Sequence, residues 1–351
     1  MFRIFSACCL TALFISPASA QIADSTMYVH YIDVGQGDAT LLEFSCGAVL
    51  IDAGGQNAEM TDSLISYLNQ FFRDRTDLNR TLESVIVTHN HIDHTRALRE
   101  VVQAFTVRRV IHNGKFGSSN RDQGDTDVRW CINNAVAESL LVIDVDDSLI
   151  TGTSGLTSAD IDPVNCSGTN PVIRILSADL ATDPGWDATG HEFRNKNNHS
   201  IVVRVDFGRA SFLFTGDLEE PAIETMVDYY DNTRTLDVDV YQVGHHGSYN
   251  GTTWTLVSAM SPEIAVFSCG RWDDERMWTG FRYGHPRDDA VDLLEDEITR
   301  RRSSSKSVHV AWAARRFRLQ TMRDAIYATA WDGTVKVRAT VSGRYRVTVE
   351  R

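Results

Sequence analysis

The sequence predicts an α/β protein, and three observations lead to this fold class. Short apolar segments rich in β-branched residues recur along the chain, separated by turns of Gly, Asp and Gln, as expected for strands. Longer stretches with helical periodicity lie between some of them. Several strand-like segments run directly into histidine or aspartate, which places metal-binding side chains at strand ends. A chain of 351 residues can form one large α/β unit of two or four layers.

The first twenty residues have the pattern of a secretory signal. Arg3 gives a weakly positive start, residues 4–15 form an apolar run too short to span a membrane, and residues 18–20 read Ala-Ser-Ala, a typical cleavage site. We therefore expect an exported protein, periplasmic or secreted, with a retained membrane anchor as the less favoured alternative.

The charge balance restricts the partners. Loss of the signal removes Arg3 and takes the formal net charge from −13 to −14. An acidic chain is unsuited to tight, non-specific binding of nucleic acid. A small molecule or a nucleic-acid fragment is still a suitable substrate, because bound metal ions bring their own positive charge.

The expected elements follow from these patterns. We expect strands at Tyr28–Asp33, Thr40–Phe44, Ala48–Asp52, Ser84–Thr88, Arg109–Asn113, Val172–Leu176, Ser200–Phe207, Ala210–Thr215, Val238–Val243 and Ile264–Ser268. We expect helices at Met60–Phe72, Ala97–Phe105 and Pro221–Tyr230. The segment Gly333–Val349 alternates apolar and polar residues around Ser342-Gly343, which predicts a hairpin. Residues 114–198, rich in Gly, Ser, Asp, Asn and Thr up to about residue 170, are interpreted as an elaborated insertion over the site within a single domain, 21–351.

Four cysteines follow the signal: Cys46, Cys131, Cys166 and Cys269. An even number in an oxidising compartment permits disulfides. We favour a Cys131–Cys166 pair because these residues flank a polar, turn-rich stretch. The alternative is four buried thiols.

The stretch Thr88-His89-Asn90-His91-Ile92-Asp93-His94 is the strongest functional signal. Three histidines and one carboxylate fall within six positions, directly after the apolar run at 85–87. Imidazole and carboxylate suit zinc, manganese or iron, so one loop can offer ligands to two adjacent ions.

A dinuclear site needs ligands from elsewhere in the chain, and two later strand ends supply them. The strand at 210–215 runs into Gly216-Asp217, where a carboxylate could bridge two cations; the alternative is a helix N-cap. The strand at 238–243 runs into Gly244-His245-His246-Gly247-Ser248, where adjacent histidines between glycines are unlike core packing.

Together these residues resemble the metallo-β-lactamase fold superfamily and, more narrowly, the hydrolase domain of the ComEC/Rec2 competence family. The resemblance runs from about Met27 to about Val349. It is carried by these motifs: Asp33-Val34-Gly35-Gln36-Gly37-Asp38-Ala39, Leu50-Ile51-Asp52-Ala53-Gly54, the histidine loop, Asn197-Asn198-His199-Ser200, Thr215-Gly216-Asp217, His245-His246-Gly247-Ser248, Tyr283-Gly284-His285-Pro286 and Trp331-Asp332-Gly333-Thr334. It implies a four-layer αββα sandwich and a hydrolase with two divalent metal ions, zinc being favoured over manganese or iron.

The resemblance also implies roles for individual residues. His89 and His91 would hold one metal, Asp93, His94 and His245 the other, and Asp217 would lie between them. Asp93 would also orient the attacking water. Asp52 would brace the histidine loop by hydrogen bonds, and Asp38 matches a family-specific position near the site.

Some positions are left open. The superfamily's third histidine corresponds to His199 or, less favoured, His191, or to neither. Where the competence family tends to have glycines after the loop, this chain has Arg96, which either grips a phosphate or carboxylate or is solvated.

The roles of three residues that follow the later strands are also left open. His285 is a substrate contact or a capping residue. Ser248 is a turn residue or a substrate hydrogen-bond donor. His246 is assigned to the substrate side of the site.

Three functions are compatible with these features. The first is a phosphodiesterase or nuclease-like hydrolase acting outside the cytoplasm. The second is a hydrolase of a carboxylic ester, lactone or β-lactam. The third is a non-catalytic binding domain that keeps the fold, against which the intact histidine loop argues.

Overall fold

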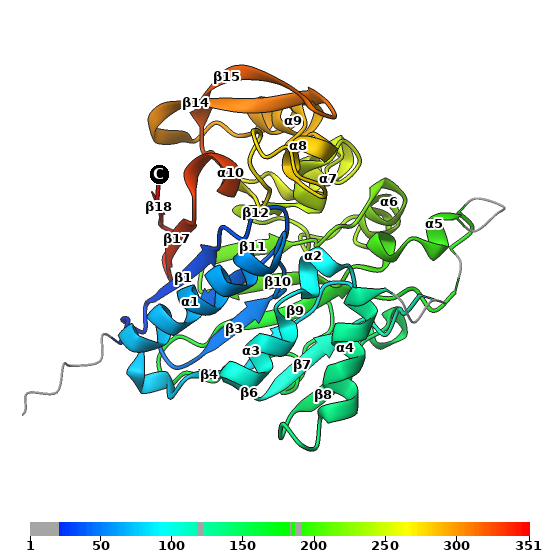
Figure 1. Cartoon of the computed structure of the whole chain (residues 1–351), viewed down its shortest axis with the longest axis vertical. Coiled ribbons are helices and arrows are strands. Elements are labelled where there is room, and N and C mark those ends of the chain that lie inside the picture. The colour runs from blue at the N-terminus through cyan, green and yellow to red at the C-terminus, as the bar shows by residue number, and fades with distance from the viewer. Residues whose placement is uncertain (1–20, 118–121, 183, 187–190) are drawn as a thin grey trace, which may run out of the picture.

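Two β-sheets pack face to face and helices cover both outer faces, so the chain forms the expected αββα sandwich (Figure 1). The computed structural model describes residues 21–117, 122–182, 184–186 and 191–351. The expected signal peptide, 1–20, lies outside the described residues. Within the described part of the chain, no helix has both the length and the apolar character needed to cross a bilayer.

The strands of the first sheet are β1 (Thr26–Tyr31), β2 (Thr40–Glu43), β3 (Ala48–Ile51), β5 (Ser84–Ile86), β7 (Arg109–His112), β8 (Leu141–Asp144), β17 (Val335–Thr340) and β18 (Tyr345–Val349). Those of the second are β9 (Val172–Ser177), β10 (Val202–Phe207), β11 (Ala210–Phe214), β12 (Val240–Val243), β13 (Ile264–Phe267) and β16 (Ile326–Ala328). Two separate pairs are β4 (Thr81–Leu82) with β6 (Thr106–Val107), and β14 (Arg301–Ala313) with β15 (Arg316–Asp324).

The helices are α1 (Ala58–Asp74), α2 (Ile92–Thr95), α3 (Leu98–Ala104), α4 (Gln123–Asn134), α5 (His191–Arg194), α6 (Glu220–Tyr229), α7 (Trp254–Met260), α8 (Gly280–Tyr283), α9 (Asp288–Glu297) and α10 (Thr329–Asp332). Short 3₁₀ turns are η1 (Thr76–Leu78), η2 (Asp147–Leu149), η3 (Lys196–His199) and η4 (Gly244–Gly247).

Strand order explains where the site forms. The sheets run β18-β17-β1-β2-β3-β5-β7-β8 and β16-β13-β12-β11-β10-β9. β3, β5 and β7 are parallel neighbours in the first sheet, as are β11 and β12 in the second. Because the carboxyl ends of parallel strands lie at the same edge of a sheet, the loops after these strands gather there.

Side chains alternate between the two faces of each strand, and this alternation divides the hydrophobic core into two parts. Leu42, Val49 and Ile86 pack between the sheets, while Leu41 and Leu50 pack under α1, α3 and α4 on the outer face. This is the period of two that sends successive side chains to opposite faces of a sheet. The second sheet is covered on its outer face by α6, α7 and α9.

Most expected elements are confirmed within a few residues, including the C-terminal hairpin β17–β18. The segment 114–198 is more regular than expected, because it contributes helix α4 and the edge strand β8 to the sandwich itself. The long hairpin β14–β15 was not expected. It lies at the end of the molecule that also carries α8 and α9 (Figure 1).

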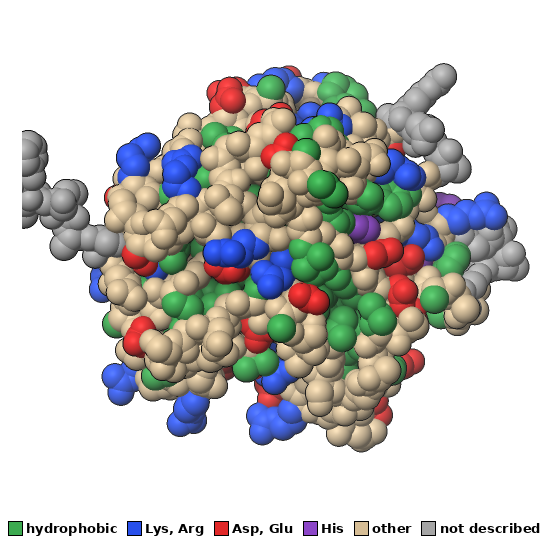
Figure 2. Space-filling view, turned by 90° about the horizontal axis from the view of Figure 1, so that it is seen from below, with side chains coloured by type: hydrophobic (Ala, Val, Ile, Leu, Met, Phe, Trp, Pro, Cys, Tyr) green, Lys and Arg blue, Asp and Glu red, His purple; other side chains and the backbone are tan. Residues whose placement is uncertain are grey.

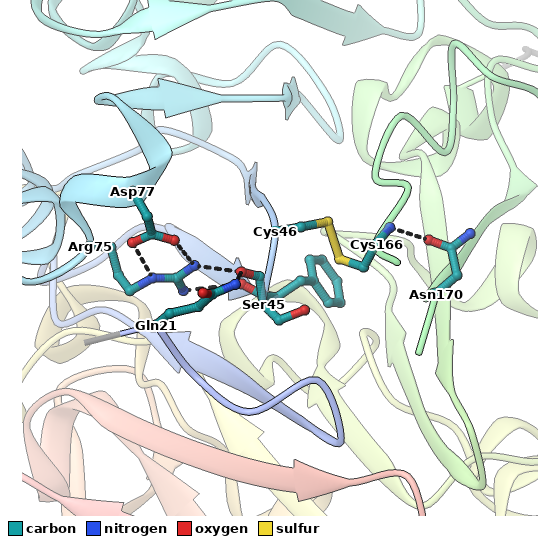
Figure 3. Close-up of a disulfide and its surroundings, with 8 residues drawn as sticks. Gln21, Ser45, Cys46, Arg75, Asp77, Cys166 and Asn170 are labelled. Atoms are coloured by element: carbon teal, nitrogen blue, oxygen red, sulfur yellow. Dashed lines mark hydrogen bonds and ion pairs between the residues drawn. A yellow bond between two sulfur atoms is a disulfide. The ribbon is translucent and has the colours of Figure 1, made fainter. Parts of the chain in front are cut away.

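The expected disulfide is wrong in one partner: Cys166 is bonded to Cys46 (Figure 3). Cys131 lies in α4, in the cluster on the outer face of the first sheet, whereas Cys166 belongs to the core between the sheets. The sheet therefore separates the two residues that the sequence suggested as a pair. Cys131 and Cys269 are free and buried.

The turn that carries Cys46 is held from its other side. The Arg75 guanidinium donates to the carbonyl oxygen of Ser45 at 3.0 Å and pairs with Asp77 at 2.8 Å (Figure 3). The same group donates to Glu43 at 2.8 Å. The disulfide therefore joins the segment before β9 to a turn that is already fixed.

Candidate metal centre

The backbone of the histidine loop is held by the two glycine-containing loops that precede it in the chain. The carbonyl oxygen of Asp93 accepts hydrogen bonds from the amides of Asp38, at 3.1 Å, and Gly55, at 3.2 Å. A Cβ atom on Gly54 would lie 1.6 Å from the same oxygen. This backbone approach explains why a residue without a side chain stands at position 54.

Asp52 braces the loop from beneath. Its carboxylate accepts from the backbone amide and the hydroxyl of Thr88, both at 2.7 Å. Its Oδ2 also lies 2.7 Å from Nδ1 of His94. Because Nδ1 is held by Asp52, Nε2 of His94 points the other way and lies 3.2 Å from Oδ1 of Asp217.

Asp38 lies behind the cluster. It belongs with Asp52 and His94 to a group whose candidate ligand atoms are all within 4.8 Å of one another. Its carboxylate accepts hydrogen bonds from Gln242 and from Thr40, the latter at 3.2 Å. Burial, with the neighbouring charge of Asp52, raises the pKa of Asp38 to about 6. Its position suits a support for His94 rather than a contact with substrate.

The other wall of the site comes from the second sheet, where η4 follows β12. His245 and His246 both have left-handed backbone conformations, with φ of 48° and 54°. Nδ1 of His246 lies 2.7 Å from the carbonyl oxygen of Ser268, which directs Nε2 to within 3.4 Å of Asp93 and 3.5 Å of Asp217. His245 is more peripheral, with Nε2 3.8 Å from Asp217.

Four side chains form the tightest group, each offering one ligand atom within 4.8 Å of the others: Asp93, His94, Asp217 and His246. His89 lies beside them, with Nε2 3.9 Å from Oδ2 of Asp217. His91 follows on the outer side, its Nδ1 3.0 Å from Nε2 of His89. The histidine loop, Asp217 and η4 therefore meet, as the sequence suggested. The tertiary structure places His246, rather than His245, in the closest group.

The donor set fits a divalent metal ion. Nε2 of His94 and Nε2 of His246 are buried and have no hydrogen-bond partner among the described residues. A buried polar atom without a partner is costly, and both atoms face the carboxylates of Asp93 and Asp217. Two imidazole nitrogens with two carboxylates are ligands of the kind that zinc, manganese and iron accept.

Electrostatics also favours a bound cation. Burial acts to raise the pKa of Asp217, but the charges of His246 and His94 outweigh it and hold that pKa well below its usual value. Burial acts to lower the pKa of His94, but Asp217 and Asp52 raise it well above 6.5. Burial and the neighbouring His94 lower the pKa of His89 well below its usual value. Asp217 is thus held as an anion among imidazole nitrogens, an arrangement that suits a bound cation.

The expected third histidine is not brought into the cluster. Nδ1 of His199 lies 2.7 Å from Asp179 and accepts from the amide of Leu180 at 3.1 Å. Its Nε2 lies against the carbonyl oxygen of Phe193. Both ring nitrogens therefore face away from the candidate ligands. His191 is exposed in α5.

A pocket of about 500 Å³ opens above the cluster, lined by Gln36, His91, Ile92, Asp93, Asp122, Asn197, Asp217, His245, His246, Trp278, Tyr283 and His285. Asn197, from the Asn-rich segment, reaches the site in place of His199, and its amide lies 3.4 Å from Nε2 of His245. His285 lines the pocket as expected, and its Nδ1 lies 3.1 Å from the side-chain amide of Gln36. The sequence motifs did not single out Trp278, although it lies shortly before Tyr283 and His285, which line the same pocket.

The remaining expected residues lie near the pocket but not in its lining. Arg96 lines an adjoining pocket of about 200 Å³, and its Nε donates to the carbonyl oxygen of Gly55 at 2.7 Å. Ser248 is buried, and its hydroxyl donates to Asn250 at 2.7 Å. That geometry suits a turn residue.

A protein-family model described as the metallo-beta-lactamase superfamily matches residues 32–271. The chain belongs to this superfamily. That range contains the histidine loop, Asp217 and η4, so the match covers the whole candidate metal centre.

The similarity to the ComEC/Rec2 family is also confirmed. ComE operon protein 3 of Bacillus subtilis is 25% identical over 300 residues, which cover 82% of this chain and 33% of that protein. Recombination protein 2 of Haemophilus influenzae is 27% identical over 263 residues, covering 72% of this chain and 25% of that protein. The chain thus spans a third or less of the length of these relatives. Among solved structures, the metallo-beta-lactamase fold protein YhfI of Bacillus subtilis matches with a TM-score of 0.38 and 11% identity, covering 69% of this chain and 85% of that one.

Proposed function

We propose that the protein is an exported hydrolase that holds two divalent metal ions and cleaves phosphodiester bonds in small or nucleic-acid-fragment substrates. Zinc is the first choice of metal, with manganese or iron as alternatives. The observation that carries the proposal is the pair of buried, unpartnered imidazole nitrogens of His94 and His246, which face two carboxylates beneath an open pocket. Membership of the metallo-beta-lactamase superfamily supports hydrolysis at a metal site.

The residues divide into two ligand sets around Asp217. His89 and His91 would hold one ion, and Asp93, His94 and His246 would hold the other. His245 is close enough to Asp217 to join the second set after a small side-chain movement. When bound, two such ions activate a water molecule and polarise the bond under attack.

The chain's own residues position the reaction. Asp93, at the floor of the pocket, orients the attacking water by accepting a hydrogen bond from it. Asn197 and His285 face the substrate from the pocket walls. Gln36 fixes the ring of His285 through its contact with Nδ1.

Two observations support a phosphodiester over other substrates. The similarity to the competence family includes a relative named for recombination. Arg96 lines the adjoining pocket, where a guanidinium suits a second phosphate. The surface charge bears instead on the length of the substrate: positive and negative side chains are interspersed over the face shown in Figure 2, so the described part of this face has no continuous basic surface of the kind that favours a long polyanion.

The test begins with the protein purified from Gln21 onward. Bound metal is quantified after loading with zinc or manganese, and hydrolysis is measured on bis-nitrophenyl phosphate, short single-stranded DNA, a lactone and nitrocefin. We expect about two ions per chain and activity on the first two substrates. Activity on the lactone or nitrocefin alone would overturn the phosphodiesterase assignment.

Two histidine variants provide the matched comparison. His91→Ala should lower activity at least 100-fold, because it removes a proposed ligand, whereas His191→Ala, in exposed α5, should leave activity within about twofold. Full activity in His91→Ala together with less than one ion per chain would overturn the enzyme assignment. Export is tested separately by expressing the full chain and locating it by cell fractionation.

A further inference from the structure

Four aromatic rings form a ladder from the solvent to the metal centre. The ring centroids of Trp278 and Tyr283 are 6.4 Å apart, those of Tyr283 and His285 are 5.6 Å apart, and those of His285 and His246 are 6.2 Å apart. The last two pairs are nearly parallel, at 20° and 24°. The inner end of this aromatic ladder is a candidate ligand, and the outer end lies at the surface.

The outer two rings are not explained by core packing. The side chain of Trp278 is 66% exposed and that of Tyr283 is 41% exposed, although both are large and apolar. Trp278 also has a φ of +60°, which a bulky residue rarely adopts. Strained backbone at the mouth of a pocket is typical of a position kept for binding.

The two rings also lie at the boundary between two pockets. Trp278 and Tyr283 line both the pocket above the cluster and the adjoining pocket that holds Arg96. Among the residues that the structure describes, no lysine or arginine lines the main pocket, and Arg96 is the one such residue lining the adjoining pocket. In the described part of the chain, Trp278 and Tyr283 therefore separate the main pocket from the pocket that holds the Arg96 guanidinium.

We propose that Trp278 and Tyr283 form the subsite for a planar ring carried next to the scissile phosphate. When the scissile bond of a substrate lies at the cluster, the group next to that bond lies against the rings of Trp278 and Tyr283. A nucleobase or another planar aromatic group would be stabilised there by stacking. Preferred substrates are then nucleotide-like diesters rather than diesters of aliphatic alcohols. This inference rests on the proposed function for the identity of the scissile group.

The experiment compares two product-like ligands that share a phosphate and differ in the ring. Calorimetry measures the affinity of the zinc-loaded protein for adenosine 5′-monophosphate and for ribose 5-phosphate. We expect the nucleotide to bind at least about tenfold more tightly, as one stacked base commonly provides. Trp278→Ala and Tyr283→Ala should each remove most of that difference, and Trp278→Phe should retain much of it.

The control is Trp254→Ala. Trp254 is 72% exposed, begins α7 and does not line either pocket, so the ratio of the two affinities should not change. Bound metal and circular dichroism of each variant show whether the fold and centre are intact. If Trp278→Ala or Tyr283→Ala fails to fold, Trp278→Phe and Tyr283→Phe give the graded comparison.

The outcomes separate this inference from the proposed function. Equal affinities for the two ligands in the wild type, or an unchanged ratio in well-folded Trp278→Ala, would overturn the aromatic subsite even if bis-nitrophenyl phosphate is hydrolysed. A ratio that depends on Trp278 supports the subsite even if that ester is not hydrolysed, and only the proposed function would then fail.

Discussion

The two walls of the metal centre present histidines in different ways. The histidine loop follows β5 and is fixed from outside, by Asp52 beneath it and by the amides of Asp38 and Gly55 around it. The η4 turn follows β12 and depends on its own backbone, which is left-handed at His245 and His246 between two glycines, with an outside contact from the carbonyl oxygen of Ser268 to the ring of His246.

This difference determines which amino-acid substitutions each wall of the site tolerates. In the histidine loop, neighbouring segments position the ligands, so substitutions in those segments should disturb the centre. In η4, the left-handed backbone together with the contact between His246 and Ser268 decides which of two adjacent histidines faces the carboxylates. Identical residue types in consecutive positions are therefore not equivalent.

The largest expected effect is that of Gly54→Ala. Its Cβ would lie 1.6 Å from the backbone oxygen of Asp93, so the loops must separate, and the free energy of unfolding should fall by more than about 3 kcal/mol. Gly247→Ala should cost about 2 kcal/mol, because Gly247 has a φ of +79° and an added Cβ would lie 2.4 Å from the buried ring of Phe267. Urea denaturation measures both.

Gly47→Ala is the control for these variants. Its nearest neighbour would be a flexible side-chain carbon of Glu83 at 3.3 Å, so the change should stay below about 1 kcal/mol. If Gly54→Ala is as mild as Gly47→Ala, the histidine loop is not held by this close approach.

The next effect compares the two histidines of η4. His246→Ala should weaken zinc binding at least 100-fold, because it removes an unpartnered nitrogen from the tightest group. His245→Ala should weaken it about tenfold or less. Titration against a zinc chelator measures both affinities. If His245→Ala weakened zinc binding more than His246→Ala, His245 rather than His246 would be the metal ligand of this turn.

Asp52→Asn tests the brace under the histidine loop. An amide keeps the shape but loses one of the two acceptor oxygens that Thr88 and His94 share. Zinc affinity should fall about 10–100-fold. Asp144→Asn, whose carboxylate is 66% exposed at the end of β8, is the control and should bind zinc like the wild type. An unchanged affinity in Asp52→Asn would mean that the backbone contacts alone position the loop.

The smallest effect on the centre should come from the disulfide, which lies outside both walls. Reducing Cys46–Cys166, which closes a loop of 120 residues, should lower the free energy of unfolding by about 2–4 kcal/mol while leaving zinc affinity unchanged. The Cys46→Ala/Cys166→Ala double variant should no longer respond to reductant. A change in zinc affinity on reduction would show that the first wall depends on this distant link.

Much of the site was predictable because ligand chemistry follows from residue type. The histidine loop and Asp217 are visible as short motifs at strand ends, and the brace by Asp52 was implied by the family resemblance. His199 was not predictable as a residue outside the cluster, because its contacts with Asp179 and Phe193 depend on packing between segments. The same reason explains the wrong cysteine partner, since only the sheet separates Cys131 from Cys166.

By itself, the sequence determined that this is an α/β protein with a loop of candidate metal ligands, because strand periodicity and residue types are local properties. Only the tertiary structure decided which histidine of η4 meets Asp93 and Asp217, and that Trp278 and Tyr283 stand over the pocket. Those choices depend on backbone handedness and on contacts between residues far apart in the chain. No local pattern encodes either of them.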